Sequence, residues 1–154
     1  MPNLKVTTKE DIVLQGRQQG STRTMTFSNI VDVFNRTYSF KQQTLTSLYT
    51  THNDTVSGAV FDDGSVKYVR ITNLGAQPIA INVMGENTLA YAYEIQKVQS
   101  MYLYNHSLVV EADDSDAITG TELSTLEDID EVKAYCHKGA GRVEVFIAST
   151  EAAK

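Results

Sequence analysis

Apolar and polar positions alternate with a period of two along most of the 154-residue chain. The pattern is clearest in the valine- and isoleucine-rich residues 66–71 and 79–84, and the threonine-rich residues 44–51 also suit the half-buried surface of a sheet. Such alternation is typical of strands that bury one face of a sheet and expose the other. The chain is therefore predicted to contain roughly eight to ten short strands, with turn signals about every 8 to 12 residues.

Two glycine-containing turns are predicted to close β-hairpins. In residues 73–78, Gly75 can adopt a positive φ angle and Pro78 cannot donate to a sheet ladder, so the apolar runs on either side are separate strands. Residues 139–141, with the sequence Gly-Ala-Gly, separate a second pair of alternating runs and predict a terminal hairpin.

A short helical turn is expected just before this terminal hairpin. Ser124 and Glu127 have the spacing of a capping box, and apolar residues recur there at a spacing of three, which indicates a helical turn at about residues 124–129. The other elements are predicted strands. The predicted fold class is therefore all-β: an antiparallel β-sandwich, jelly-roll or immunoglobulin-like, with at most one short helical turn.

The length of the chain suits one two-layer core, so a single domain over residues 1–154 is expected. Its polar ends are predicted to form a flexible N-terminal arm, at about residues 1–11, and a short C-terminal tail, at about residues 150–154. Leu4 and Val6 give the arm apolar side chains to bury on a partner. Both are therefore interface candidates.

The composition is that of an ordinary folded protein, with 42% hydrophobic and 21% charged residues. No apolar run approaches the roughly 18 to 20 residues of a membrane span, and the N-terminus lacks the apolar stretch of a signal peptide. Neither membrane association nor export is therefore expected. The single cysteine, Cys136, has no second cysteine with which to form an internal disulfide.

The charge is unevenly distributed. Nine of the 19 acidic residues lie in residues 111–131, which contain no Lys or Arg. The rest of the chain contains ten acidic and 13 basic residues. Such an acidic stretch can dock against a basic patch on a neighbour, or it can be a solvated loop. Because the Lys and Arg residues are spread singly and form no basic stripe, nucleic-acid binding is not expected.

The search for catalytic chemistry assigns no residue. His52, His106 and His137 do not have the spacing of metal ligands, and Cys136 and His137 are predicted to point to opposite faces of a strand, the cysteine buried. Residues 16–21 lack the lysine and the glycine spacing of a phosphate-binding loop and indicate a flexible loop. We therefore expect no enzyme, no cofactor and no metal; an enzyme with a site assembled across loops is the alternative.

Three aspartates crowd a probable loop within the acidic stretch: Asp113, Asp114 and Asp116. Clustered carboxylates suit Ca²⁺, but a loop starting at Asp114 has Ile118 where an EF-hand requires an oxygen ligand. The three aspartates are therefore taken as interface candidates.

Tyrosine is the abundant aromatic residue, with eight Tyr and no Trp. Tyr91 and Tyr93 are two residues apart, as are Tyr102 and Tyr104, so the members of each pair share one face of a strand. Tyrosines in this pattern indicate core or interface packing, or a platform that binds sugar. All four are interface candidates.

Two stretches resemble a known group of proteins. The sequence FDDGSVKYVRITNL, at residues 61–74, and the sequence VEVFIAS, at residues 143–149, are similar to small virion structural proteins of tailed bacteriophages, particularly those of marine cyanophages. The resemblance extends in layout over about residues 55–149. It implies a β-sandwich that builds or decorates a particle and has no catalytic residues to carry over.

This resemblance makes a capsid decoration protein the expected function, in a virion assembled in the host cytoplasm. The expected partners are other virion proteins, either the major capsid protein or neck and tail proteins, and further copies of the chain. A neck or tail component and a carbohydrate-binding, receptor-contacting module are the alternatives.

Overall fold

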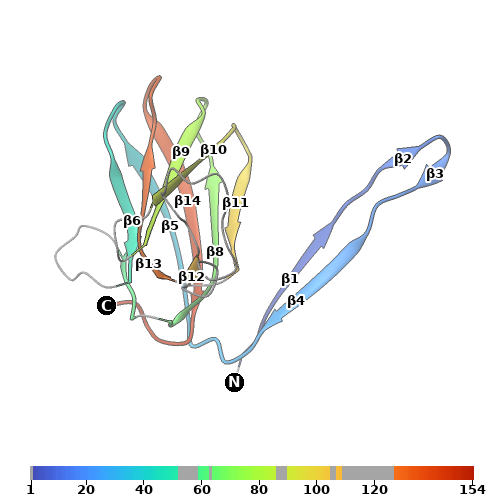
Figure 1. Ribbon diagram of the computed structural model, residues 1–154, viewed down its shortest axis with the longest axis horizontal. Helices are drawn as coiled ribbons and strands as arrows, with labels where there is room; N and C mark the ends of the chain where they lie inside the picture. The colour runs from blue at the N-terminus through green and yellow to red at the C-terminus, as the bar shows by residue number, and fades with distance from the viewer. Residues whose placement is uncertain (1, 52–58, 63, 86–89, 105–106, 109–126) are drawn as a thin grey trace, which may run out of the picture.

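The protein is an all-β sandwich with a projecting ribbon (Figure 1). This computed structural model describes the chain except residues 1, 52–58, 63, 86–89, 105–106 and 109–126. The described residues form strands and contain no helix, and hence none that could cross a membrane. The predicted β-sandwich is thereby confirmed.

The sandwich consists of two facing sheets. The first, called here the β9 sheet, has the strand order β10 (Ala90–Ile95), β9 (Ile79–Gly85), β13 (Glu127–Tyr135), β6 (Thr46–Thr50) and β7 (Ala59–Val60), and β12 (Ser107–Leu108) also pairs with β13. The second, the β8 sheet, has the order β11 (Ser100–Leu103), β8 (Val66–Asn73), β14 (Gly141–Ser149) and β5 (Asp32–Phe40). Neighbouring strands are antiparallel except β6 and β7, which are parallel.

The strand order is that of a jelly roll. β5, β8, β11 and β14 lie in one sheet, whereas β6, β9, β10 and β13 lie in the other, so the chain repeatedly crosses between the layers. The orders β11-β8-β14-β5 and β10-β9-β13-β6 are those of the two four-stranded sheets of an eight-stranded jelly roll. Of the two sandwich types expected from the sequence, the topology selects the jelly roll.

Both predicted hairpins are wrong in their pairing. β8 and β9, which flank residues 73–78, lie in opposite sheets, and so do β13 and β14, which flank residues 139–141. The alternating pattern is the same whether two strands pair in one sheet or face each other across a core. Here each strand finds its hydrogen-bonding partners elsewhere in the chain, and each turn therefore carries the chain across the core.

Asn73 holds the first of these crossings in place. Its side chain is fully buried, and its Nδ2 donates to the carbonyl oxygens of Gln77, at 2.8 Å, and Ile95, at 3.1 Å. Its Oδ1 accepts a hydrogen bond from the backbone N–H of Gly75 at 2.8 Å. One buried amide thus bonds two backbone groups of the turn and one at the end of β10.

The expected helical turn is also wrong where the structure describes it. Residues 127–129 belong to β13, in which Ile129 pairs with Gly85 and is buried in the core. Residues 124–126 lie outside the described residues. Burial of Ile129 and pairing with β9 outweigh the local capping preference, which is worth only about 1 kcal/mol.

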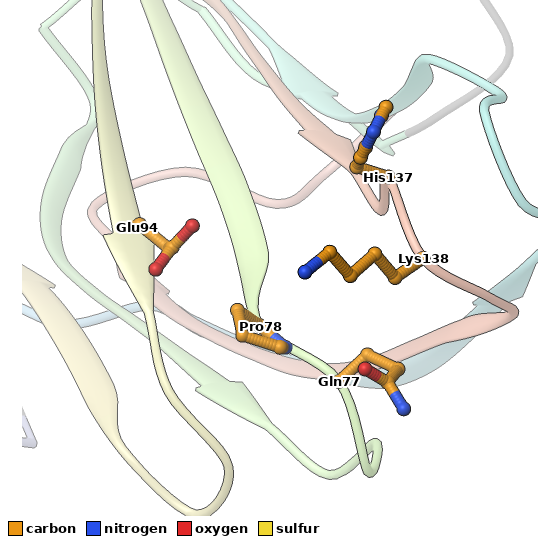
Figure 2. A pocket seen from close by; sticks show the side chains of 5 residues that line it. All are labelled: Gln77, Pro78, Glu94, His137 and Lys138. Carbon is orange, nitrogen blue, oxygen red and sulfur yellow. The ribbon is translucent and has the colours of Figure 1, made fainter.

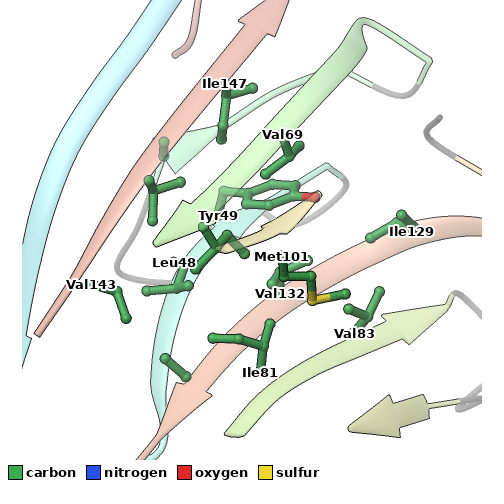
Figure 3. Packing of buried hydrophobic residues seen from close by; sticks show 14 of the residues in the cluster. Leu48, Tyr49, Val69, Ile81, Val83, Met101, Ile129, Val132, Val143 and Ile147 are labelled. Atoms are coloured by element: carbon green, nitrogen blue, oxygen red, sulfur yellow. The ribbon is translucent and has the colours of Figure 1, made fainter. Parts of the chain in front are cut away.

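The core lies between the two sheets and contains the inward-facing residues of both (Figure 3). Alternate residues of β9 and β14 are fully buried: Ile79, Ile81, Val83, Val143, Val145 and Ile147. In the same cluster, Tyr49 of β6 and Met101 of β11 fill the space between the sheets. Each large apolar side chain buried in this way contributes about 1.5–3 kcal/mol relative to an exposed one.

The C-terminal tail is bound to the sandwich by backbone hydrogen bonds. The N–H of Thr150 donates to the carbonyl oxygen of Ser65 at 2.9 Å, and the N–H of Lys154 donates to that of Val60 at 2.9 Å. The predicted tail at residues 150–154 therefore follows the surface of the sandwich in this structure.

Replacing Asn73 tests whether its amide holds the crossing from β8 to β9. Asn73→Ala should lower the free energy of unfolding by about 2–3 kcal/mol, because three hydrogen bonds of about 1 kcal/mol each are lost. Urea denaturation measures this change. Asn35→Ala, at an exposed site on β5, is the control and should change stability by less than about 0.5 kcal/mol. Equal effects of the two substitutions would contradict the role of Asn73.

Candidate functional site

The N-terminal segment forms a β-ribbon that projects away from the sandwich (Figure 1). β1 (Leu4–Lys9) pairs with β4 (Thr22–Phe27), and β2 (Val13–Leu14) pairs with β3 (Arg17–Gln18) nearer the tip. We call residues 2–27 the arm. The arm expected from the sequence, at about residues 1–11, covers only the first strand of this ribbon and the chain leading to its tip.

Two glycines allow the arm to fold back on itself. Gln15 and Gly16 both have positive φ angles, 51° and 75°, as the two central residues of a type I′ hairpin turn require. At Gly20, a Cβ atom would lie 1.9 Å from the carbonyl oxygen of Glu10, so only glycine fits. The sequence signal, Gln-Gly, is a weak relative of the Asn-Gly pair that favours this turn. Residues 17–18 of the predicted flexible loop at residues 16–21 form β3 in the structure.

The tip of the arm exposes three consecutive aliphatic residues. Ile12, Val13 and Leu14 are 46%, 62% and 51% exposed. In Figure 1, β2 lies at the end of the arm farthest from the sandwich, so nothing described in the protein's own body covers these side chains. Clustered exposed apolar residues mark surfaces that bind other molecules. These three residues are not among the interface candidates predicted from the sequence.

Polar side chains near the tip bind one another. Asp11 accepts hydrogen bonds from Gln18, at 2.6 Å, and from Lys9, at 3.0 Å. These two bonds lower the pKa of the Asp11 carboxyl from its ordinary value. Glu10 accepts a hydrogen bond from the hydroxyl of Ser21 at 2.9 Å. Both acids of the arm are therefore engaged within it, and they help to hold its two strands in register.

The base of the arm packs on the outer face of the β8 sheet. The ring of Phe27 lies 5.6 Å from that of Tyr68 and 6.5 Å from that of Tyr104, measured between centroids. Leu4 and Val6 are half-buried against the same apolar cluster. These two interface candidates therefore contact the protein's own sandwich, and they anchor the arm to it.

The four tyrosines singled out from the sequence meet in one groove. Tyr91 and Tyr93 of β10 line it with Tyr102 of β11 and Tyr104, which follows that strand. β10 and β11 are end strands of the two sheets, so the groove lies along one edge of the sandwich. Its volume is about 370 Å³, and its remaining lining residues are Ser100 and Met101. We call it the tyrosine groove.

The two tyrosine pairs reach the groove from different faces. Tyr93 lies opposite the buried Ile81 of β9, whereas Tyr102 lies opposite Arg70 on the outer face of β8. Tyr93, Tyr102 and Tyr104 are 56%, 45% and 44% exposed, and the rings of the last two are nearly parallel, with centroids 6.1 Å apart. Tyr91 packs against the core, and this burial raises the pKa of its hydroxyl.

A second, smaller pocket of about 280 Å³ is lined by Gln77, Pro78, Glu94, His137 and Lys138 (Figure 2). It lies beside the two turns, at residues 73–78 and 139–141, that carry the chain from one sheet to the other. The chain of Lys138 extends toward Glu94 and Pro78, whereas the ring of His137 points away from them (Figure 2). Cys136 is fully buried and its neighbour His137 is exposed, as the strand pattern predicted. The pair therefore does not form a nucleophile and base in this structure.

The remaining candidates fall outside what the structure describes. Asp113, Asp114 and Asp116 belong to residues 109–126, which lie outside the described residues. Among the described residues, no group of three or more His, Cys, Asp or Glu side chains is placed to hold a metal ion.

Comparison with known proteins adds no relative. No family model, no curated protein and no solved structure matches the chain. The arm and the tyrosine groove are therefore the features from which a function must be inferred.

Removing the ring that anchors the arm tests its attachment to the sandwich. Phe27→Ala should increase amide hydrogen exchange in β1 and β4 at least several-fold, because two aromatic contacts of about 0.5–1.5 kcal/mol each are lost. Amides of β14, in the centre of the β8 sheet, should keep their protection.

Phe27→Leu is the matched control for this experiment, since it retains an apolar side chain and should have a smaller effect. Unchanged exchange in β1 and β4 of the Phe27→Ala protein would contradict the proposed anchor.

Proposed function

We propose that this chain is a non-enzymatic structural protein of a tailed-phage virion, a capsid decoration protein that attaches through the faces of its sandwich and through its arm. The observation that carries the proposal is the projecting arm, whose tip exposes Ile12, Val13 and Leu14. A ribbon with an apolar tip suits attachment to a neighbouring molecule.

The jelly roll by itself supports the proposal only weakly. Jelly rolls occur in viral capsid proteins, but also in lectin domains and in cupins, so the fold does not determine a function. What favours assembly is the combination of a rigid two-layer body with an arm that reaches beyond it. In a particle with many copies each contact can be modest, because multivalency strengthens the whole.

The proposed partners are the major capsid protein, or neck and tail proteins, together with further copies of this chain. The proposed location is the virion, assembled in the host cytoplasm. A neck or tail component is the nearest alternative within the same class, since arms and sandwich faces serve equally well in a ring.

The number of copies per particle tests this proposal. Quantitative mass spectrometry of gradient-purified virions should find the chain at on the order of hundreds of copies if it decorates the capsid, because decoration follows the capsid lattice. About six or twelve copies would place it in a neck or tail ring instead. If the chain is made during infection but is missing from purified virions, the proposal of a virion protein is wrong.

A carbohydrate-binding module is the second candidate, and the tyrosine groove is the observation that favours it. Aromatic rings that face solvent can stack on sugars, and three of the four rings are nearly half exposed or more. In this case Tyr93→Ala and Tyr102→Ala should each abolish binding to a glycan array. Leu45→Ala, at an exposed aliphatic site away from the groove, is the control. Absence of any glycan binding by the unaltered protein would contradict this candidate.

A further inference from the structure

We propose that the arm tip of one copy inserts into the tyrosine groove of a second copy, so that copies join head to tail. This inference rests on the proposed function, because it names the contact through which copies of a structural protein would associate. Its two halves are the exposed residues 12–14 and the groove between β10 and β11.

The arm needs a partner for physical reasons. An isolated two-stranded ribbon is marginally stable in water, and here only the base of the arm packs against the sandwich. Toward the tip, Val13 and Leu14 are 62% and 51% exposed, so burial of either side chain against a partner is favourable. The turn at Gln15 and Gly16 already holds them in a defined conformation, so little ordering is needed when they bind.

The partner has to be another molecule. Phe27 and its contacts with Tyr68 and Tyr104 fix the direction in which the arm leaves the body. Figure 1 shows the ribbon extending away from the sandwich, with β2 and β3 at its far end. The tip therefore cannot reach the groove of its own chain while this base contact persists.

The chemistry of the groove favours an apolar occupant over a sugar. Among the described residues, its lining comprises four tyrosines, Met101 and Ser100, and these carry no carboxylate, amide or charged side chain. Sugar sites combine aromatic rings with several converging polar groups, which these lining residues supply only as hydroxyls. Aliphatic side chains instead find aromatic faces and a thioether to pack against.

Charge complementarity brings the two halves together. The arm carries Lys5, Lys9, Arg17 and Arg23 against Glu10 and Asp11, which gives it a net charge of +2. The whole chain has a net charge of −6, so the residues outside the arm carry −8. Both acids of the arm are engaged within it, and Arg17, beside the tip, is exposed. A positive arm approaching a negative body is steered toward association, and two arms repel each other.

This contact has a defined geometry. It joins two different surfaces, a tip and a groove, so a run of linked copies keeps one unused tip at one end and one unused groove at the other until a ring closes. Copies of the chain would therefore form open filaments or closed rings, of which a reciprocal exchange of arms between two copies is the smallest. Rings suit a neck or tail, and short runs of linked copies suit a capsid surface.

The decisive experiment mixes two variants, each with one half of the contact removed. Val13→Glu places a negative charge on the tip, and Tyr93→Lys removes a ring from the groove and repels the arm. Both sites are more than half exposed, so the sandwich should fold. In sedimentation velocity the unaltered protein should form oligomers that grow with concentration, and each variant alone should associate at least about 30-fold more weakly.

An equimolar mixture of the two variants should form at least a one-to-one dimer, because the intact tip of the Tyr93→Lys protein can enter the intact groove of the Val13→Glu protein. Leu45→Glu is the matched control: this leucine is 52% exposed, close to the 51% of Leu14, and the variant should assemble like the unaltered protein. Thermal melts confirm that each variant is folded, and Leu14→Ser replaces Val13→Glu if the latter is not.

Several results would overturn the inference. They are an unaltered protein that stays monomeric at millimolar concentration, a Tyr93→Lys protein that still self-associates, and a mixture that forms no dimer. Glycan binding that Tyr93→Lys abolishes without affecting self-association would make the groove a sugar site. Because these measurements use only purified protein, their outcome is independent of the copy number in virions, which tests the proposed function itself.

Discussion

The structure depends on the burial of one face of every long sandwich strand against the opposite sheet. Along β14, Val143, Val145 and Ile147 point into the core, so Glu144 and Phe146 must point outward. The same parity holds for β8, which places Val69 and Ile71 inside and Tyr68 and Arg70 outside. A shift of one residue in either strand would reverse both sets, so the core also determines the chemistry of the outer surface.

The outer face of the β8 sheet connects the core to the arm. Tyr68 and Phe146 form part of an aromatic cluster there, and the nearby Arg70 binds Glu144 at 2.6 Å. Phe27, at the end of β4, lies against Tyr68. The direction of the arm is thus set by side chains whose orientation follows from the packing on the other face of the same strands.

The tyrosine groove arises where the two sheets end. Tyr91 still packs against the core, whereas Tyr93, two residues further along β10, is 56% exposed. On β11, Tyr102 faces outward and stacks with Tyr104. An inward-facing and an outward-facing aromatic pair are brought together because β10 and β11 are the end strands of their sheets.

The sequence by itself determined the class of the fold and which residues of a strand share a face, including Tyr91 with Tyr93 and Tyr102 with Tyr104. All of these follow from the period-two geometry of a strand. It did not determine which strands pair. The alternating runs around residues 73–78 predict a hairpin as well as a crossing, and the choice depends on hydrogen-bonding partners distant in the chain. For the same reason, only the tertiary structure brings the four tyrosines together in one groove and places the apolar residues 12–14 at the end of a projecting ribbon. Both arrangements depend on contacts between segments distant in the chain, which the local sequence pattern does not specify.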